Sequence, residues 1–357
     1  MMMYRVSDLI KLEDIKQWNL KDVITITAGC GTGKSYWVKN VLYNYAKENG
    51  HKILFLVHRS NCKNQFEEEI INDNKTDVID ITTYQSIESS ILGRKEIDLD
   101  KYTYIIADEY QYFCDDATFN KNSDVSLNEI LNSNTIKIFM SATDDLIKNY
   151  LKIKKKIEVI EYEMPSTFDF IRSLSFFNKQ DTMFEIAAEC IENNDKCIFF
   201  IQSAKLAYEL YSKFKDHAIF NCSKSNKEYY KHVNKQSIID ILKNQKFDKN
   251  ILITTCVMDA GVNILDLNLN HIICDVFDVN TLLQCMGRKR IIQEGDGFHL
   301  YIKSISNKQL GGIKTSTEKR LKKAEFLLDF GTEAYVRSYY KNTNDYSNII
   351  YDDIVDG

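Results

Sequence analysis

Short apolar runs, rich in β-branched and aromatic residues, recur along the N-terminal part of the chain and are separated by helix-length segments of mixed polarity. Near-continuous apolar strands that alternate with helices are typical of a parallel sheet covered on both faces. The pattern therefore predicts an α/β domain with strands at Val23 to Thr27, Ile53 to Val57, Val78 to Ile81, Tyr104 to Ala107 and Ile136 to Met140.

The same alternation starts again further along the chain, which predicts a second α/β domain in tandem. Its expected strands are Cys197 to Ile201, Ala218 to Cys222, Ile251 to Thr255, His271 to Cys274 and Phe298 to Ile302. The only proline, Pro165, lies between the two sets of strands and indicates a linker there. After Ser306 the strand pattern gives way to a charged helical segment and a polar tail. We expect divisions at 1–160, 161–305 and 306–357, the last a short helical or irregular extension.

The composition is that of an ordinary soluble globular protein, with 44% hydrophobic and 27% charged residues in 357. A net charge of −5 and a pI of about 5.8 argue against a surface that binds nucleic acid indiscriminately. Two basic stretches remain, Lys148 to Lys156 and Lys303 to Lys323. Each either lines a phosphate track or forms the solvated face of a helix.

The nine cysteines are scattered, with no CxxC pair and no Cys/His spacing of a metal site. This argues against zinc and against a disulfide framework, and it is typical of reduced core cysteines in a cytosolic protein. No apolar stretch has the length of a membrane span. We therefore expect a cytoplasmic protein without a membrane partner.

The clearest chemical motif is AGCGTGKS, at Ala28 to Ser35, which follows an expected strand and precedes a helix-like segment. In that context the string predicts a phosphate-binding P-loop, whose free backbone N–H groups hold a polyphosphate at the start of a helix. Lys34 would reach the β and γ phosphates, and the Ser35 hydroxyl would bind Mg²⁺. The sequence thus predicts a nucleotide site.

An acidic pair, Asp108 and Glu109, follows the fourth expected strand in YIIADEYQ. Because ligands bind at the carboxyl ends of parallel strands, both side chains should point toward the nucleotide. Asp108 suits the metal and Glu109 suits the polarisation of the attacking water. The alternative is an acidic turn after a buried strand, which a P-loop upstream makes the weaker interpretation.

Three further segments follow expected strands of the first domain: Leu56 to Gln65, Ile81 to Ile87 and Phe139 to Asp145. The first contains Arg59, a candidate phosphate contact, and the last contains SAT at Ser141 to Thr143. Alone, each has an ordinary explanation, since Arg59 could be a surface residue and SAT a helix cap. Their order and spacing give them weight.

Taken together, AGCGTGKS, VHRSNCKNQ, TTYQS, DEYQ, SAT, ILITTCVMDAGVNI and QCMGRKR resemble the superfamily 2 helicase core, nearer its DEAH-like and restriction-helicase branch than the DEAD-box proteins. The resemblance covers Val23 to Arg290. It implies two tandem RecA-like P-loop domains that clamp ATP and Mg²⁺ between them, with a nucleic-acid strand crossing both.

The resemblance also implies roles for individual residues. The nucleotide would be bound by Ala28, Gly29, Cys30, Gly31, Thr32, Gly33, Lys34, Ser35 and Gly261; the metal by Ser35 and Asp108; the strand by Arg59, Thr83, Gln85, Ser203 and Thr255. Catalysis would rest on Lys34, Asp108, Glu109, Gln284, Arg288 and Arg290. An arginine from the second domain would reach the γ-phosphate and stabilise the transferred group, so hydrolysis would require the domains to close.

Two departures from the family pattern affect the second domain. The usual QxxGRxxR has an arginine where Ile291 lies, and Arg290 comes one residue early. On a helix, one residue turns a side chain by about 100°, so either Arg290 compensates or Arg288 acts alone. Asn263 also replaces an aspartate that many relatives carry. Preference for ATP is implied by the resemblance alone.

Three functions follow from this interpretation. The leading one is an ATP-dependent helicase or translocase on nucleic acid, with DNA favoured over RNA and with protein partners in a replication, repair or mobile-element assembly. The second is a strand-stimulated ATPase subunit that remodels a protein–nucleic acid assembly without unwinding. The third is a regulatory nucleotide-binding protein that hydrolyses weakly, although binding alone needs no water-polarising Glu109.

Overall fold

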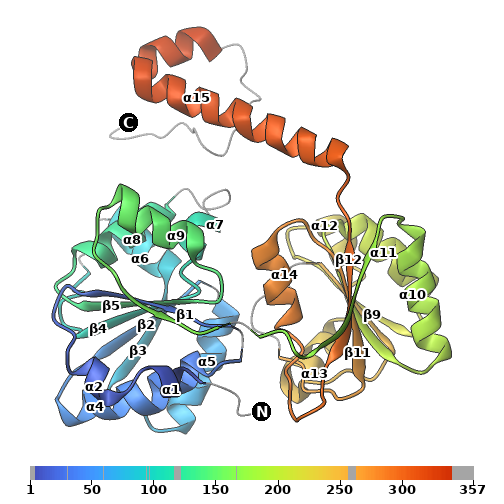
Figure 1. The fold of residues 1–357 in the computed structure, drawn as a ribbon, viewed down its shortest axis with the longest axis horizontal. Coiled ribbons are helices and arrows are strands. Elements are labelled where there is room, and N and C mark those ends of the chain that lie inside the picture. Colours follow the sequence, from blue (N-terminus) through green and yellow to red (C-terminus); the bar gives the residue numbers. More distant parts are fainter. Residues whose placement is uncertain are drawn as a thin grey trace.

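The first domain is built on a six-stranded, all-parallel sheet, drawn in Figure 1 as the blue-to-green half of the molecule. This computed structural model describes residues 5–29, 31–58, 60–93, 95, 97–115, 122–165, 167–255 and 263–339. The strand order is β3-β2-β4-β5-β1-β6. Their bounds are β1 Val23–Thr27, β2 Ile53–Val57, β3 Ile79–Thr83, β4 Tyr104–Asp108, β5 Ile136–Ser141 and β6 Ile160–Glu163.

Helices cover both faces of this sheet because successive residues of its strands point to opposite sides. Ile24 and Phe55 pack with the helices of one layer, whereas Val23 and Leu54 pack with those of the other. The first layer contains α1 Val6–Leu9, α2 Leu12–Ile15, α3 Lys34–Trp37, the π-helical turn η1 Val38–Leu42, α4 Tyr43–Glu48 and α5 Ser60–Asn72. The second contains α6 Tyr84–Leu92, α7 Tyr112–Asp115, α8 Ser123–Asn132, α9 Asp145–Asn149 and η3 Tyr150–Lys154.

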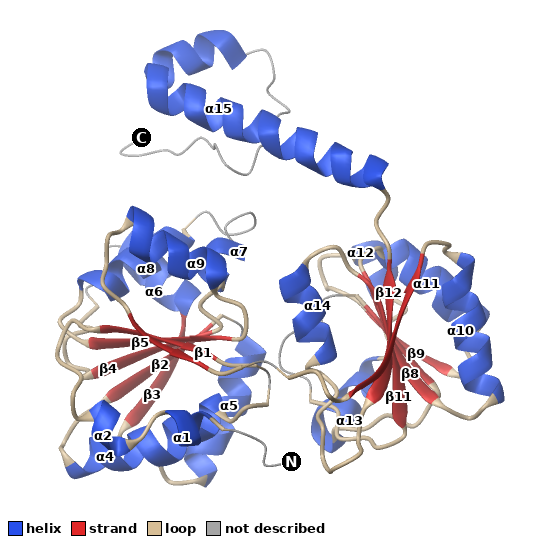
Figure 2. Cartoon of the chain, in the orientation of Figure 1, coloured by secondary structure: helices blue, strands red, loops and turns tan. Residues whose placement is uncertain are grey.

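The second domain repeats this plan with another six-stranded parallel sheet, ordered β7-β12-β11-β8-β10-β9. Its strands are β7 Ile171–Phe177, β8 Lys196–Ile201, β9 Ala218–Asn221, β10 Ile251–Thr254, β11 Leu269–Asp275 and β12 Phe298–Lys303. Figure 2 shows both sheets as central layers between helices. One face carries α10 Asp181–Glu192, α11 Ala204–Lys213 and α12 Lys227–Tyr230; the other carries α13 Lys235–Asn244 and α14 Val279–Met286.

The expected fold, two tandem α/β domains with parallel sheets and a mainly helical C-terminal segment, is confirmed. All ten expected strands form, and two further strands, β6 and β7, lie at sheet edges. The division expected after residue 160 needs correction, because β6 pairs with β1 and brings residues up to Glu163 into the first sheet. Pro165 follows directly, in the connection to the second domain.

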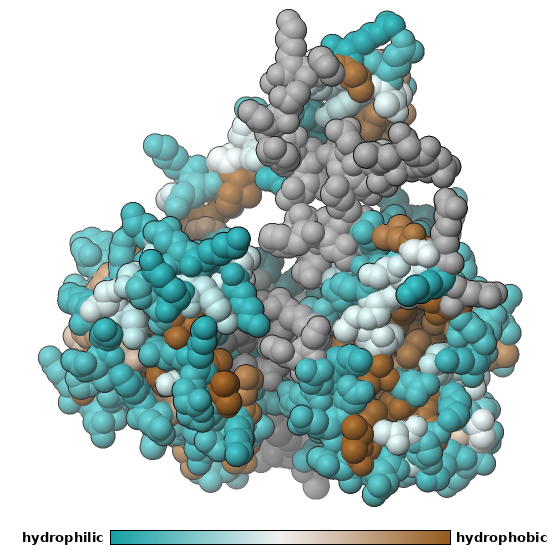
Figure 3. Space-filling view, turned by 180° about the vertical axis from the view of Figure 1, so that it is seen from behind, coloured by the Kyte–Doolittle hydropathy of each residue, from teal (hydrophilic) through white to brown (hydrophobic). Residues whose placement is uncertain are grey.

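Beyond the second sheet the described chain forms one long helical element, α15 Asn307–Tyr339, which bends at Gly331, where φ is 79°. None of its residues is buried, and Figure 1 shows it projecting away from the second sheet. It contains most of the basic stretch 303–323, so those lysines lie on a solvated helix. The face of the molecule in Figure 3 is mostly hydrophilic, with apolar side chains in small groups. No helix within the described ranges has both the length and the apolar character to cross a bilayer.

Candidate functional site

The loop between β1 and α3 has the geometry that its glycines permit. Gly31 and Gly33 have φ values of 81° and 84°, a left-handed conformation that costs residues with a side chain more than glycine. Lys34 begins α3 and folds back over the loop, where its Nζ donates hydrogen bonds to the carbonyls of Ala28 at 2.7 Å and Gly29 at 3.3 Å. Thr32 closes the loop through a 2.8 Å hydrogen bond to the Gly29 carbonyl. The loop thus forms a compact cradle at a helix start.

A cavity of about 340 Å³ lies beside this loop, and both domains line it. The second domain reaches the P-loop itself: a Cβ added to Gly31 would lie 3.2 Å from Nη1 of Arg290. The structure therefore brings together residues that are far apart in sequence. From the expected site these are Gly29, Gly31, Gly33, Lys34, Ser35, Asp108, Glu109, Gln284, Arg288 and Arg290, joined by Asn263.

The acidic pair at the end of β4 is electrostatically unequal. Burial and the neighbouring Glu109 raise the pKa of Asp108 to about 7, although Lys34 opposes the shift. For Glu109, burial acts in the same direction, but the charge of Lys34 and a hydrogen bond from Gln111 outweigh it and lower its pKa. Glu109 is therefore the carboxylate that remains ionised, the form required to polarise a water molecule.

A short hydrogen-bond relay fixes the position of Glu109. Gln111 donates from Nε2 to Glu109 Oε2 at 2.7 Å and accepts at Oε1 from the Ser141 hydroxyl at 2.6 Å. Ser141 in turn accepts from the backbone N–H of Thr143 at 2.8 Å. DEYQ and SAT, separated along the chain, thus form one unit at the ends of β4 and β5.

If the cavity hydrolyses ATP, as the resemblance implies, substituting Gln111 by alanine should leave Glu109 free to rotate and lower kcat by roughly 10²-fold, the cost of a misplacement near 1 Å. KM for ATP should change little, because Gln111 lies outside the residues that line the nucleotide cavity. Steady-state kinetics would measure kcat and KM for Gln111→Ala and for Gln111→Glu, a variant that keeps the length of the side chain but loses its hydrogen-bond donor. An unchanged kcat in both variants would remove the positioning role.

A second network lies beneath the loop and was not predicted from the sequence. Asp144 accepts hydrogen bonds at Oδ2 from the hydroxyls of Thr27 and Tyr110, each at 2.7 Å. Lys148 lies 3.7 Å from the other carboxylate oxygen. This network links the end of β1, the DEYQ turn and the start of α9. Its only sequence signal was the aspartate following SAT.

The arginines of QCMGRKR lie outside the helix that precedes them, which corrects the assumption of helical spacing. α14 ends at Met286, and Lys289 forms a parallel β-bridge with Ile264. Arg288 and Arg290 both line the nucleotide cavity, whereas the Lys289 side chain is fully buried. Both arginines are therefore available to one ligand.

Each arginine is held by a neighbour. Arg288 donates from Nε to the Gln284 carbonyl at 3.1 Å, and Arg290 donates from Nε to Asn263 Oδ1 at 2.8 Å. Asn263, at the position where many relatives carry an aspartate, is thus the anchor of Arg290 in this structure. An amide places the guanidinium without neutralising it, so Arg290 keeps its charge for the cavity.

The residues expected to contact a strand that the structure describes, Thr83, Gln85, Ser203 and Thr255, lie outside this cavity. Thr83 caps α6 by accepting from Ser86 N at 3.1 Å, and Gln85 donates to the His58 carbonyl at 2.9 Å. Ser203 caps α11, and the Thr255 hydroxyl is buried without a hydrogen-bond partner in the described part of the chain. Arg59, Cys30 and Gly261 lie outside the described residues.

The donor set of the cavity fits Mg²⁺. The Ser35 hydroxyl and the Asp108 carboxylate line the same space, and both are hard oxygen ligands. Within the described ranges no group of three or more His, Cys, Asp or Glu side chains forms a metal site of its own. A magnesium ion bound mainly through nucleotide phosphates needs only one or two protein oxygens, which this pair supplies.

Comparisons with known proteins agree with this architecture. A family model described as type III restriction enzyme, res subunit, matches residues 3–146, and one described as helicase conserved C-terminal domain matches residues 178–290. No curated protein matches the sequence.

Solved structures resemble the chain at low sequence identity. Mss116p bound to ssRNA and AMP-PNP is 14% identical, with a TM-score of 0.57 over 90% of this chain and 78% of that one. S. cerevisiae Dbp5 bound to RNA and ADP BeF3 is 16% identical, with a TM-score of 0.57 over 84% and 83%. The type ISP restriction-modification enzyme LlaBIII bound to DNA is 13% identical, with a TM-score of 0.57 over 82% and 27%. The solved structures share the fold of two RecA-like domains. The two consecutive family models, one in each domain, show that the chain belongs to the superfamily 2 helicases.

Proposed function

We propose that the chain hydrolyses ATP, with Mg²⁺, in the cavity between its two RecA-like domains, and that a bound nucleic-acid strand stimulates this reaction and is moved by it. The observation that supports the proposal most is that one cavity is lined by the P-loop, by Glu109 and by two arginines of the other domain. Nucleotide binding alone needs no such combination of a water-polarising carboxylate and cations supplied across a cleft. Solved relatives bound to RNA or DNA support the choice of a strand as partner.

The residues divide the chemical work. The P-loop backbone and Lys34 would bind the β and γ phosphates once Lys34 exchanges its present hydrogen bonds to the Ala28 and Gly29 carbonyls. Glu109, ionised and held by Gln111, would accept a hydrogen bond from the attacking water. Mg²⁺ held near Ser35 and Asp108 supplies charge neutralisation when bound. Arg288 and Arg290 would stabilise the charge on the transferred phosphoryl group.

Because the arginines and Glu109 come from different domains, the rate of hydrolysis would depend on the relative arrangement of the two domains. A strand that contacts Thr83 and Gln85 on the first domain and Ser203 and Thr255 on the second would favour the closed arrangement. Its contacts would be mainly to the phosphate backbone, so binding would show little sequence preference. This links strand binding to the rate of chemistry and chemistry to movement.

Replacing Lys34 by alanine should abolish ATP turnover, because the β and γ phosphates lose the point charge that holds them in the loop. Binding of a single strand should persist, since the strand contacts lie elsewhere. Hydrolysis and fluorescence anisotropy with a labelled oligonucleotide measure the two properties separately. Lys314→Ala, on the exposed α15, is a matched control. Normal hydrolysis by Lys34→Ala would contradict the assignment.

A second candidate is a motor that remodels a protein–nucleic acid assembly without separating strands itself. A strand-displacement assay with the purified chain separates the two functions. Unwinding without partners would support the helicase, whereas strand-stimulated hydrolysis without unwinding would support the remodelling subunit.

A further inference from the structure

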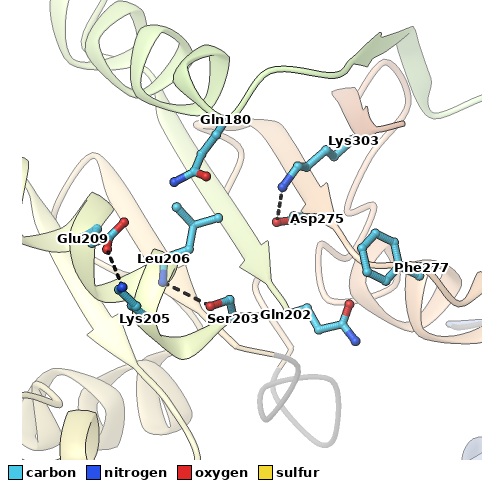
Figure 4. Close-up of a pocket in the computed structure, with 9 residues that line it drawn as sticks. All are labelled: Gln180, Gln202, Ser203, Lys205, Leu206, Glu209, Asp275, Phe277 and Lys303. Carbon is cyan, nitrogen blue, oxygen red and sulfur yellow. Dashed lines mark hydrogen bonds and ion pairs between the residues drawn. The ribbon is translucent and has the colours of Figure 1, made fainter. Parts of the chain in front are cut away.

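A second cavity, of about 500 Å³, opens at the carboxyl-terminal edge of the second sheet. Four neighbouring strands contribute to it: Gln180 follows β7, Lys303 ends β12, Phe277 follows β11 and Gln202 follows β8. This edge is where ligands of parallel α/β sheets bind. Figure 4 shows these side chains around the opening. None of them lines the nucleotide cavity, so the two sites are separate.

The charges of this second cavity cancel. Lys303 Nζ lies 2.9 Å from Asp275 Oδ2, and Lys205 Nζ lies 4.0 Å from Glu209 Oε1. Figure 4 shows both pairs on its walls. Since each of these lysines already has a carboxylate partner, the cavity offers a phosphate little net attraction. Its chemistry favours a neutral polar ligand.

Phe277 gives the cavity an aromatic wall on a fixed support. Its side chain is 47% exposed, although an aromatic ring of this size gains most from burial. Before it, Asp275 ends β11 and its carbonyl accepts from Gln202 N at 3.1 Å. After it, Asp278 caps α14 by accepting from Thr281 N at 2.6 Å. The exposed ring is thus positioned between two ordered elements rather than on a long loop.

We propose that this cavity binds a base of a single-stranded nucleic acid, which stacks on Phe277 while the Gln180 and Gln202 amides face its polar edge. An aromatic face beside amide donors and acceptors, without net charge, matches a nucleobase better than a phosphate. Ser203, expected to contact the strand, lines the same cavity. The inference rests on the proposed function, because a strand must cross the second domain, and it adds a base contact to a path otherwise recognised through phosphates.

The test compares a strand that has bases with one that lacks them. Full-length protein is titrated with dye-labelled oligothymidylate or oligouridylate, whichever stimulates hydrolysis, and with an abasic strand of the same length. Phe277→Ala should weaken binding of the base-containing strand by about fivefold to a hundredfold, the effect of losing one stacked base. Binding of the abasic strand should stay unchanged. Phe277→Tyr should retain the affinity of wild type for both.

Two controls separate stacking from a folding defect. Phe168→Ala removes another exposed aromatic ring, 45% exposed and outside this cavity, and should change neither titration. Phe277→Trp should keep the affinity, and its indole fluorescence should be quenched by the base-containing strand alone, since Trp18 and Trp37 are buried. The inference is overturned if Phe277→Ala loses affinity equally for both strands, or if it loses affinity for neither. Failure of the wild type to bind any strand overturns the proposed function as well.

Discussion

Substituting Arg288 by alanine should lower strand-stimulated ATP hydrolysis by about 10³- to 10⁵-fold, the usual value of an arginine that neutralises the transferred phosphoryl group. Arg288 lines the cavity opposite the P-loop, and its Nε is anchored on the Gln284 carbonyl at 3.1 Å. Its charge also contributes to the lowered pKa of Glu109, after larger effects from Lys34 and Gln111. The loss should appear in kcat, because the charge it stabilises develops during transfer.

Arg290 lines the same cavity, so its substitution tests whether the two arginines act together. If both arginines act on the same phosphoryl group, Arg290→Ala should also reduce kcat, and the double variant should lose less than the product of the two single effects. Arg288→Lys should recover only part of the rate, because an ammonium lacks the planar fork. Arg320→Ala, on the exposed α15, serves as control. A wild-type rate in Arg288→Ala would leave Arg290 as the only catalytic arginine.

Substituting Asp296 by alanine should destabilise the second domain by about 3–5 kcal/mol, the cost of leaving one member of a buried ion pair without its partner. Lys289 Nζ lies 2.7 Å from Asp296 Oδ1, and the two side chains are 0% and 1% exposed. Lys289 also donates to the Asp266 carbonyl at 2.9 Å, and Asp296 accepts from Ile292 N at 3.0 Å. The pair therefore ties the segment carrying both arginines to the turn after it.

Removing one charge of a buried ion pair leaves the other charge unpaired, whereas replacing both charges by apolar side chains does not. Lys289→Met with Asp296→Leu removes both charges together with two hydrogen bonds to backbone groups, so it should cost about 2 kcal/mol, less than Asp296→Ala alone. Hydrogen exchange of β11 and β12 peptides across a urea series would measure the free energy of the second domain specifically. If Asp296→Ala exchanges like the wild type, the pair contributes no stability. If the double variant is as unstable as the single one, the loss of stability comes from lost packing and not from the unpaired charge.

Strands with buried residues could be predicted from the sequence, including the edge strands β3 and β9, whereas the mostly exposed edge strands β6 and β7 could not. The interior strands β2, β5 and β10 are buried at every position, so their apolar runs stand out from the helices around them. The edge strand β9 is buried throughout and was predicted, whereas β7 is exposed from Arg172 to Phe176 and β6 is mostly exposed. Their alternation carries no signal of burial, which is why both strands and the limit of the first sheet were missed.

The candidate site shows the same division at the level of side chains. The P-loop and Asp108–Glu109 could be predicted because their chemistry is confined to a few adjacent residues. The direction of the Arg290 side chain could not be predicted, since it depends on the chain leaving α14 at Gly287 and entering a β-bridge. The hydrogen-bond partner of Gln111 could not be predicted either, because Ser141 lies on another strand and becomes its neighbour only when the sheet forms.

Charged and aromatic residues in connecting segments gave the least information. Lys289 reads as one more cation in GRKR, yet its side chain and that of its partner Asp296 are both buried, while the arginines on either side line the cavity. Phe277 follows a strand without any motif around it, and only the arrangement of four strand ends reveals a cavity beside its ring. These roles arise from tertiary structure and have no local pattern.

The central claim is that the cavity shared by the two domains hydrolyses ATP when a strand is bound. The most direct measurement is the rate of ATP hydrolysis by the full chain, with Mg²⁺, alone and with saturating single- or double-stranded DNA or RNA. We expect a low basal rate and a large rise with at least one single-stranded polymer, which Arg288→Ala abolishes. A rate that no polymer raises, or a stimulated rate that survives Arg288→Ala and Arg290→Ala together, would contradict it.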